Sequence, residues 1–263
     1  MHDYGFIIAG FVVGLVVGLT GVGGGSLMTP VLIFYFNVKP YMAVGTDLLF
    51  AAFTKLGGTL KFAHARLVDW RVVAHLSMGS IPAALTTLFI LKQLGTTSAD
   101  AQNLMTTTLG VALLLTAATT LYSALRGKMA PAFVVRGMER KAATARHWSL
   151  PLLFGATIGT MVTLTSVGAG AVGVVVLMIL YPMLPLPRIV AADIAYAVPL
   201  MLVAGLGHAS LGNVDWLLLA KLLAGSLPGI WLGSHLVSRI PERAVRFVLS
   251  VLLAYTGVRL IAL

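Results

Sequence analysis

Hydrophobic residues fill most of the chain in long runs that are separated by short polar connectors. Six runs approach the roughly 20 residues with which an α-helix crosses a hydrocarbon core of about 30 Å. They cover residues 42–62, 72–91, 104–125, 189–209, 217–237 and 244–262. The pattern therefore predicts six long transmembrane helices.

Four shorter apolar runs form two pairs, and a glycine-containing segment separates the members of each pair. The first pair covers residues 5–19 and 26–36, and the second covers residues 150–164 and 171–183. At a rise of about 1.5 Å per residue, each run is short for a complete crossing. We therefore expect each pair to form a re-entrant hairpin or two short helices.

The chain resembles itself at a shift of 145 to 146 residues. At 145, the matches are Leu19, Thr20, Val22, Gly23 and Gly25 with Leu164, Thr165, Val167, Gly168 and Gly170. At 146, they are Asp47, Asp69, Trp70, Gly79, Ser80 and Pro82 with Asp193, Asp215, Trp216, Gly225, Ser226 and Pro228. Each half crosses the membrane an odd number of times, so the second copy should be inverted. Inverted repeats with broken segments are typical of secondary transporters.

These patterns predict an all-α, multi-pass membrane protein. Residues 1–125 form the first transmembrane repeat, 126–147 a basic cytoplasmic loop and 148–263 the second repeat. Each repeat contains a glycine-broken pair of short helices and three long transmembrane helices.

Composition agrees with this class. The 263 residues are 59% hydrophobic and 10% charged, whereas soluble domains carry roughly 25% charged residues. Basic residues concentrate in connectors, above all in 126–147, and basic connectors face the cytoplasm. Both termini are therefore expected outside. The net charge of +10 sits in short connectors and not on a soluble face, so we expect membrane lipid as a partner and no nucleic acid.

No enzyme, metal site or cofactor is expected. The chain contains no cysteine, which excludes thiolate chemistry. The segment "GAGAVG", residues 168–173, fits a dinucleotide fingerprint, with Asp193 twenty residues further on, but the βαβ context is missing. A serine protease at "GGS", residues 24–26, is disfavoured because Ala171 replaces Ser26 in the second copy.

The glycine run in "GLTGVGGGSLMTP", residues 18–30, is the main candidate for function. Non-helical backbone at membrane depth is tolerated where it is buried in protein or lines a cavity. A helix restarting near Ser26 would present free N–H groups to an anion. Close helix packing is the simpler alternative. The candidate substrate-binding residues are Thr20, Gly21, Gly23, Gly24, Gly25 and Ser26, with Thr165, Ser166, Gly168, Ala169 and Gly170.

Three ionisable residues inside the predicted spans are further candidates. Asp47 and Asp193 occupy equivalent positions and are candidates for proton coupling, although both lie early enough in their spans to serve as interfacial helix caps. Lys55, whose repeat partner is Met201, is a candidate for charge selectivity, with Asp47 as a potential neutralising partner. His208 is expected to reach water at an interface.

These motifs resemble the TauE/SafE sulfite exporter family, also called the 4-toluene sulfonate uptake permeases. The resemblance covers essentially the whole chain. It is carried by "GLTGVGGGSLMTPVL", its echo "TLTSVGAGAVGVVVL", "GTDLL", "DW" in both halves and the basic central loop. Family motif residues fall on Gly21, Gly23, Gly24, Gly25, Pro30, Gly168 and Gly170. The second copy departs from the first at Ala169 and Val175.

The resemblance implies a prokaryotic plasma (inner) membrane transporter of small anions, such as sulfite, sulfoacetate, thiosulfate or sulfonates. Transport would follow alternating access. Because no nucleotide-binding motif is present, a proton on Asp47 or Asp193 is the simplest driving ion. An anion channel, a carrier of carboxylates and a homodimeric assembly remain open.

A valine at the glycine run tests its role. Gly24→Val should abolish transport of the anion while leaving expression and membrane insertion intact, because the branched side chain would block both the turn and the approach of a ligand to the backbone. Flux into proteoliposomes measures this. Wild-type flux in the variant would assign the glycines to helix packing.

Overall fold

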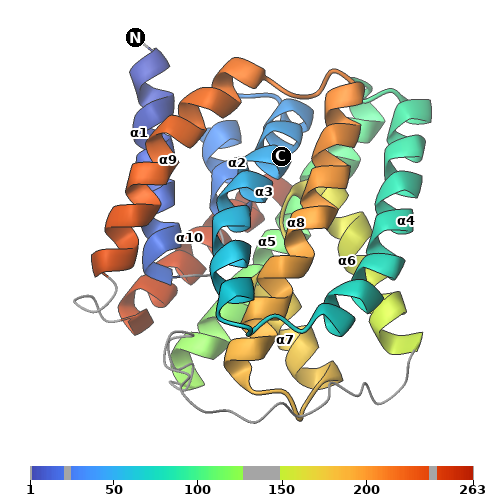
Figure 1. The fold of residues 1–263 in the computed structure, drawn as a ribbon. Helices are drawn as coiled ribbons and strands as arrows, with labels where there is room; N and C mark the ends of the chain where they lie inside the picture. The colour runs from blue at the N-terminus through green and yellow to red at the C-terminus, as the bar shows by residue number, and fades with distance from the viewer. Residues whose placement is uncertain (1, 21–24, 127–148, 237–241, 263) are drawn as a thin grey trace.

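The structure is a computed structural model that describes residues 2–20, 25–126, 149–236 and 242–262. The described residues form ten helices and no strand (Figure 1), which confirms the predicted all-α fold. The helices are α1 (His2–Thr20), α2 (Gly25–Phe34), α3 (Pro40–His64), α4 (Trp70–Leu94), α5 (Ala99–Arg126), α6 (Ser149–Thr165), α7 (Ala171–Leu180), α8 (Leu186–Ser210), α9 (Trp216–Leu236) and α10 (Glu242–Ile261).

Five helices within the described residues are long and apolar enough to cross a membrane. They are α4, α5, α8, α9 and α10. Helix α3 has the same 25-residue length as α4 and α8, but it carries Asp47 and Lys55 in its buried part. The chain is therefore a multi-pass membrane protein, and α3 buries two charged side chains inside it.

The glycine-broken pairs differ in one respect from the expectation. Helices α1 and α6 contain 19 and 17 residues, because the helical backbone extends through polar residues that end the apolar runs. The apolar parts of α1 and α6 are still shorter than the five candidate spans, and α2 and α7 have only 10 residues each. The starts of α2 and α7 agree with the predicted restarts near Ser26 and at Ala171.

The two pairs enter the fold from opposite ends. In Figure 1, α1 runs down from the top and α2 returns upward, whereas α6 rises from the bottom and α7 returns downward. The basic loop, residues 127–148, is outside the described residues. An inverted repeat would give this arrangement, and its orientation in a membrane remains a prediction.

Polar residues at the helix starts act as caps. Asp69 is the N-cap of α4, and its side chain accepts a hydrogen bond from the Arg71 N–H. Asp215 accepts one from the Leu218 N–H at 2.9 Å. These contacts confirm the capping predicted for both "DW" sequences, since an N-cap oxygen satisfies amides that have no partner in the first turn.

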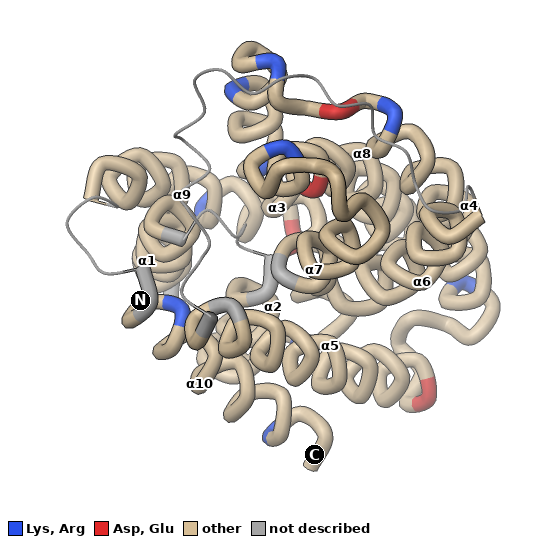
Figure 2. The backbone as a smooth tube through the Cα atoms, turned by 90° about the horizontal axis from the view of Figure 1, so that it is seen from below, with Lys and Arg blue, Asp and Glu red and all other residues tan. Residues whose placement is uncertain are grey.

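Helices of the first half pack mainly on helices of the second half. Helix α1 packs on α9, α6 on α4, α3 on α8 and α5 on α10. Figure 2 shows α3, α7 and α8 around the middle, with the α1–α9, α4–α6 and α5–α10 pairs outside them. Neither half therefore contains a complete core of its own.

Glycines bring α1 onto α9 and α6 onto α4 in matching registers. A Cβ at Gly14 would collide with the Ser226 carbonyl, and a Cβ at Gly159, 145 residues later, would collide with the Ser80 carbonyl. Gly10 and Gly155 face Leu222 and Leu76 in the same way. The packing role of small residues in membranes therefore belongs to these glycines, which lie outside the two breaks.

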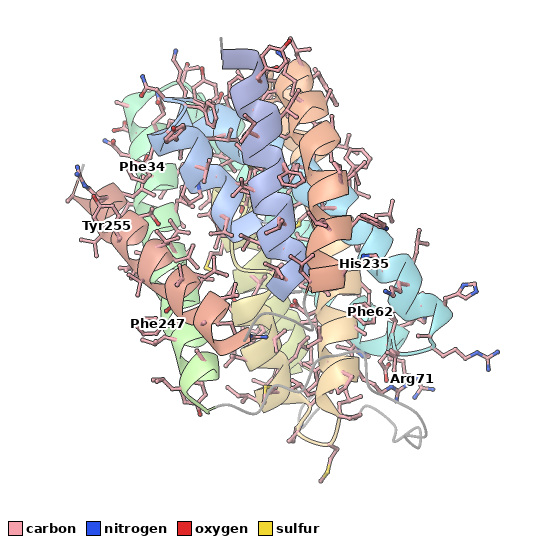
Figure 3. The ribbon with its side chains drawn as sticks, turned by 90° about the vertical axis from the view of Figure 1, so that its left-hand side faces the viewer. Phe34, Phe62, Arg71, His235, Phe247 and Tyr255 are labelled. Carbon is pink, nitrogen blue, oxygen red and sulfur yellow. The ribbon has the colours of Figure 1, made fainter. Side chains whose placement is uncertain are left out.

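The two chain ends lie toward one end of the molecule. Figure 3 places Arg71 in the lower part, and Phe34 and Tyr255 in the upper half. Helix α1 begins at the top and α10 ends in the upper half (Figure 1). The two chain ends thus lie toward the face opposite Arg71, and their exterior location is still a prediction.

A large side chain at a packed glycine should destabilise the protein. Gly159→Leu forces apart α6 and α4, an overpacking cost of about 2 kcal/mol, and should lower the apparent melting temperature in detergent by roughly 4–8 °C. Gly57→Leu is the matched control, because a Cβ at Gly57 meets no atom within 4 Å. Equal melting temperatures of the two variants would contradict the packing role.

Candidate functional site

The second glycine break is a short non-helical segment whose backbone the structure describes. It joins α6, which ends at Thr165, to α7, which begins at Ala171. Ser166, Gly168 and Gly170 have positive φ angles of 60°, 124° and 137°. A φ above zero is unfavourable for residues with a Cβ, so the two glycines are required by the turn, and Ser166 adopts an uncommon left-handed conformation.

The Thr165 hydroxyl supports this turn. It accepts a hydrogen bond from the Val167 N–H at 3.0 Å and lies 2.6 Å from the Met161 carbonyl oxygen. The hydroxyl of the next residue, Ser166, is fully buried and has no hydrogen-bond partner among the described residues. Of the two predicted hydroxyls at this second break, Ser166 is therefore the one without a hydrogen-bond partner among the described residues.

The first break lies mainly outside the described residues. This applies to Gly21, Gly23 and Gly24, and only the backbone is described for Thr20, Gly25 and Ser26. Helix α2 begins at Gly25 and contains Pro30. The predictions for these residues therefore stay predictions.

Lys55 connects the first half to the second break. Its side chain is 4% exposed, and Nζ donates a hydrogen bond to the Ala169 carbonyl oxygen at 2.9 Å. Asp193 and Asp47 are the carboxyl groups close enough to act on the ammonium electrostatically. The sequence suggested Asp47 as its partner, but the hydrogen bond goes to main chain that has left the helix.

Asp47 and Asp193 do not cap their helices. The N-cap residues of α3 and α8 are Lys39 and Pro185, and the two carboxyl groups are 0% and 1% exposed. The capping alternative is therefore wrong, since both side chains lie inside the protein. An intramembrane carboxyl group is costly, which makes it a functional candidate.

The two carboxyl groups have different partners. Asp47 Oδ2 accepts a hydrogen bond from Thr29 Oγ1 at 2.5 Å, and the Ser166 hydroxyl lies near the same carboxyl group without completing a hydrogen bond. Asp193 has no hydrogen-bond partner on either oxygen among the described residues. Its carboxyl lies against Gly173 in α7, where an added Cβ would overlap Oδ1.

Buried polar atoms without hydrogen bonds gather around the second break. Within the described residues they are Asp47 Oδ1, Asp193 Oδ1 and Oδ2, Ser166 Oγ, Tyr196 Oη, Ser80 Oγ and Ser77 Oγ. Tyr196 lies near both Ser80 and Asp193. More than 90% of buried polar groups in proteins find a partner, so this concentration makes the second break a candidate site for a polar ligand.

Sequence reasoning missed several of these residues. The Thr29 hydroxyl escaped notice because its repeat equivalent is Val174, and Ser80 was recognised only as a repeat match. Tyr196 was hidden in an apolar run. One signal was available for Tyr196: it follows Asp193 by three residues, which places both on one face of a helix.

The expectation that His208 reaches water is wrong. The side chain is fully buried, with Nε2 2.9 Å from the Thr163 carbonyl oxygen and Nδ1 3.3 Å from Asn213 Nδ2. Thr96 Oγ1 donates to Asn213 Oδ1 at 3.1 Å. This chain of contacts fixes the last turn of α6, and with it the second break, against the connectors at the α8 C-terminus.

Within the described residues, no group of three His, Cys, Asp or Glu side chains could hold a metal ion. Around the second break the described residues bring together one ammonium group, two carboxyl groups and hydroxyls next to the start of α7. An all-helical, multi-pass protein with such an interior is a membrane transporter.

The comparisons with known proteins agree with this class. The chain belongs to the sulfite exporter TauE/SafE family, whose family model matches residues 6–260. It is 36% identical over 257 residues to the "Probable membrane transporter protein YjnA" of Bacillus subtilis (strain 168), covering 97% of this chain and 98% of that protein. No solved structure matches the chain.

A more distant relative supports the same extent of similarity. The "Probable membrane transporter protein YunE" of Bacillus subtilis (strain 168) is 24% identical, with 97% of this chain and 96% of that protein aligned. The predicted family membership is therefore confirmed over nearly the whole length.

Removing the buried ammonium should destabilise the protein in a pH-dependent way. Lys55→Met leaves the Ala169 carbonyl oxygen and two carboxyl groups without their positive partner, a loss of about 3–5 kcal/mol for a buried pair. The drop in apparent melting temperature should be larger at mildly alkaline than at mildly acidic pH, because a protonated carboxyl group needs no counter-charge.

The control for this variant is Lys92→Met, at an exposed position near the end of α4. It should melt like the wild type at both pH values. Equal losses in the two variants would contradict the role of Lys55 at the break.

Proposed function

We propose that the protein is a secondary transporter of small organosulfur anions or sulfur oxyanions, such as sulfite, thiosulfate, sulfoacetate or other sulfonates. The observation that carries the proposal is the meeting of the buried Lys55 ammonium with unpaired hydroxyls and carboxyls at the second glycine break. The family description, a sulfite exporter, favours sulfur oxyanions as the solute class.

The anion is held between the two breaks. Its oxygens accept hydrogen bonds from main-chain N–H groups near Gly23–Ser26 and Gly168–Ala171, because a helix start combines free amides with the positive end of the helix dipole. Ser166 adds a hydroxyl donor and Lys55 adds the charge. Thr165 shapes the turn, so its contribution is indirect.

Selectivity for an anion follows from the position of Lys55. The ammonium of a lysine is a compact charge with three donors, and in this protein one of them is used on Ala169. A sulfonate or sulfite oxygen accepts another. A neutral solute gains no charge attraction from this donor, which favours anions over uncharged analogues.

Transport proceeds by alternating access, in which the halves rock about a fixed central site. The glycine-packed pairs α1–α9 and α4–α6 suit rigid-body movement, since close-packed surfaces move as units. A proton gradient acting through the interior carboxyl groups drives the cycle. The protein acts in the plasma membrane with both chain ends outside.

A thermal-shift screen tests the solute class. Purified protein is heated with sulfite, thiosulfate, sulfoacetate or taurine, and malonate serves as the carboxylate isostere of sulfoacetate. A sulfur-containing ligand at about 100 times its Kd should raise the apparent melting temperature by on the order of 5 °C, because it binds the folded state only.

Two variants test whether the melting-temperature shift depends on Lys55. Lys55→Met should lose the shift, whereas Lys92→Met should keep it. Stabilisation by carboxylates alone would exclude the organosulfur assignment. Saturation of uptake into proteoliposomes with rising solute concentration would separate a carrier from an open anion channel, in which flux continues to increase.

A further inference from the structure

We propose that Asp193 carries the coupling proton while Asp47 remains a fixed negative charge, so that the anion enters the site together with one proton. This inference rests on the proposed transport of anions and deepens it. It assigns different roles to two carboxyl groups that the repeat places in equivalent positions.

Asp47 has more direct contacts that favour a charged carboxylate than Asp193 has. Thr29 Oγ1 donates to Oδ2 at 2.5 Å, the Thr29 N–H points toward the same group, and the Ser166 hydroxyl lies nearby. Hydrogen bonds from donors stabilise a carboxylate over a carboxylic acid. We therefore assign the fixed negative charge to Asp47.

Asp193 lacks the corresponding donor. Val174 stands where a shift of 145 residues would place the equivalent of Thr29, and neither oxygen of Asp193 accepts a hydrogen bond from the described residues. The Gly170 N–H and the Lys55 ammonium are its nearest sources of positive charge. A buried carboxylate with so little direct compensation is the group that takes up a proton.

Gly173 in α7 leaves room for the Asp193 carboxyl group, which reaches the start of α7 from α8. An added Cβ on this residue would coincide with Asp193 Oδ1, whereas the equivalent position in the first half is Met28. The carboxyl group thus lies against bare main chain beside the predicted anion-binding amides. Substrate and proton therefore meet at the same helix start.

The charge count explains the coupling. Three charged groups act on one another around the second break: the Lys55 ammonium and the carboxyl groups of Asp47 and Asp193. Arg188 is also buried, near the start of α8, but Lys55 is the cation whose charge acts on Asp193. When both carboxyl groups are charged, the ammonium is already overcompensated and an anion is repelled. When Asp193 takes a proton from the aqueous side, Lys55 balances Asp47 alone and the entering anion loses one repulsive neighbour.

Other ionisable groups near Asp193 do not change this count. The helices packed on α8 are α3, α4, α6 and α7. Helix α3 contributes Lys55 and Asp47, and its Lys61 and His64 are exposed. Helices α6 and α7 contain no ionisable side chain, and α4 has exposed Arg71, His75 and Lys92. On α8 itself Tyr196 lies near Asp193, whereas the buried Arg188 and His208 lie near the two ends of the helix.

Hydroxyl groups lead from Asp193 toward α4. Tyr196 follows Asp193 on α8, its hydroxyl lies near Ser80, and Ser77 lies one turn earlier on α4. All three hydroxyl oxygens are buried and lack a partner among the described residues. Hydroxyls both donate and accept, so this row suits the movement of a proton to the carboxyl group.

The first test uses a carbodiimide and needs no knowledge of the solute. Dicyclohexylcarbodiimide is apolar and adds the O–H of a protonated carboxylic acid across one C=N bond, with no other reactant. Wild-type protein in lipid is treated at mildly acidic and alkaline pH, and peptide mass spectrometry locates the adduct. We expect labelling at Asp193, decreasing as pH rises, and none at Asp47.

Labelling at Asp47, at both carboxyl groups or at neither would overturn the proposal. The proposed transport function would survive any of these results, because the reaction does not involve the solute. Asp193→Asn should remove the adduct, which confirms its position.

The second test measures the pH dependence of sulfoacetate binding by thermal shift. In the wild type, the apparent affinity should fall about tenfold per pH unit once Asp193 has lost its proton, since one proton accompanies one anion. Asp193→Asn imitates the protonated group and should remove that dependence. Asp47→Asn should still lose affinity for sulfoacetate as the pH rises, even if this variant binds sulfoacetate with a different affinity from the wild type.

The two tests separate the two proposals. If Asp193 is labelled selectively but no sulfur-containing anion raises the melting temperature, the proposed solute class is excluded and the proton-carrying role of Asp193 stands. If sulfoacetate raises the melting temperature of the wild type equally at every pH, the proton coupling is excluded and the solute class stands.

Discussion

The hydrogen bond from Lys55 to the Ala169 carbonyl is the interaction on which the centre of the molecule depends. At Ala169 the chain has left α6 and has not yet entered α7, so its carbonyl has no helical partner, and lipid would offer none. An ammonium from the other half supplies the donor at 2.9 Å. The same group sets the charge of the site, which couples the shape of the break to the ions around it.

The two halves share a scaffold and differ at the site. Gly14 and Gly159 bring their helices onto α9 and α4 in equivalent registers, while Lys55 has Met201 as its counterpart and Thr29 has Val174. Packing constrains both copies in the same way, because helix contact depends on small residues at fixed spacing. The polar residues around the second break carry no such packing constraint, so they can differ between the two copies.

The sequence was sufficient for the fold class and for the positions of the breaks, because hydropathy and the 145-residue repeat depend on local residue types. The sequence pattern predicted α1 shorter than it is, since the helix continues through the polar residues at both ends of the apolar run. It also left open whether Asp47 and Asp193 capped helices. That choice depends on burial by α2 and α7, which lie far from both residues along the chain, and the contact of Lys55 with Ala169 spans 114 residues.

The packing of first-half helices on second-half helices has a consequence for biosynthesis. Helix α1 packs on α9, and the residues between Thr20 and Trp216 must be made before this partner exists. Helix α4 likewise lacks its main packing partner until α6 has been synthesised. The nascent protein must therefore hold its early helices in the bilayer with their glycine faces against lipid or an insertion factor, and the final assembly takes place only after translation has reached the last third of the message.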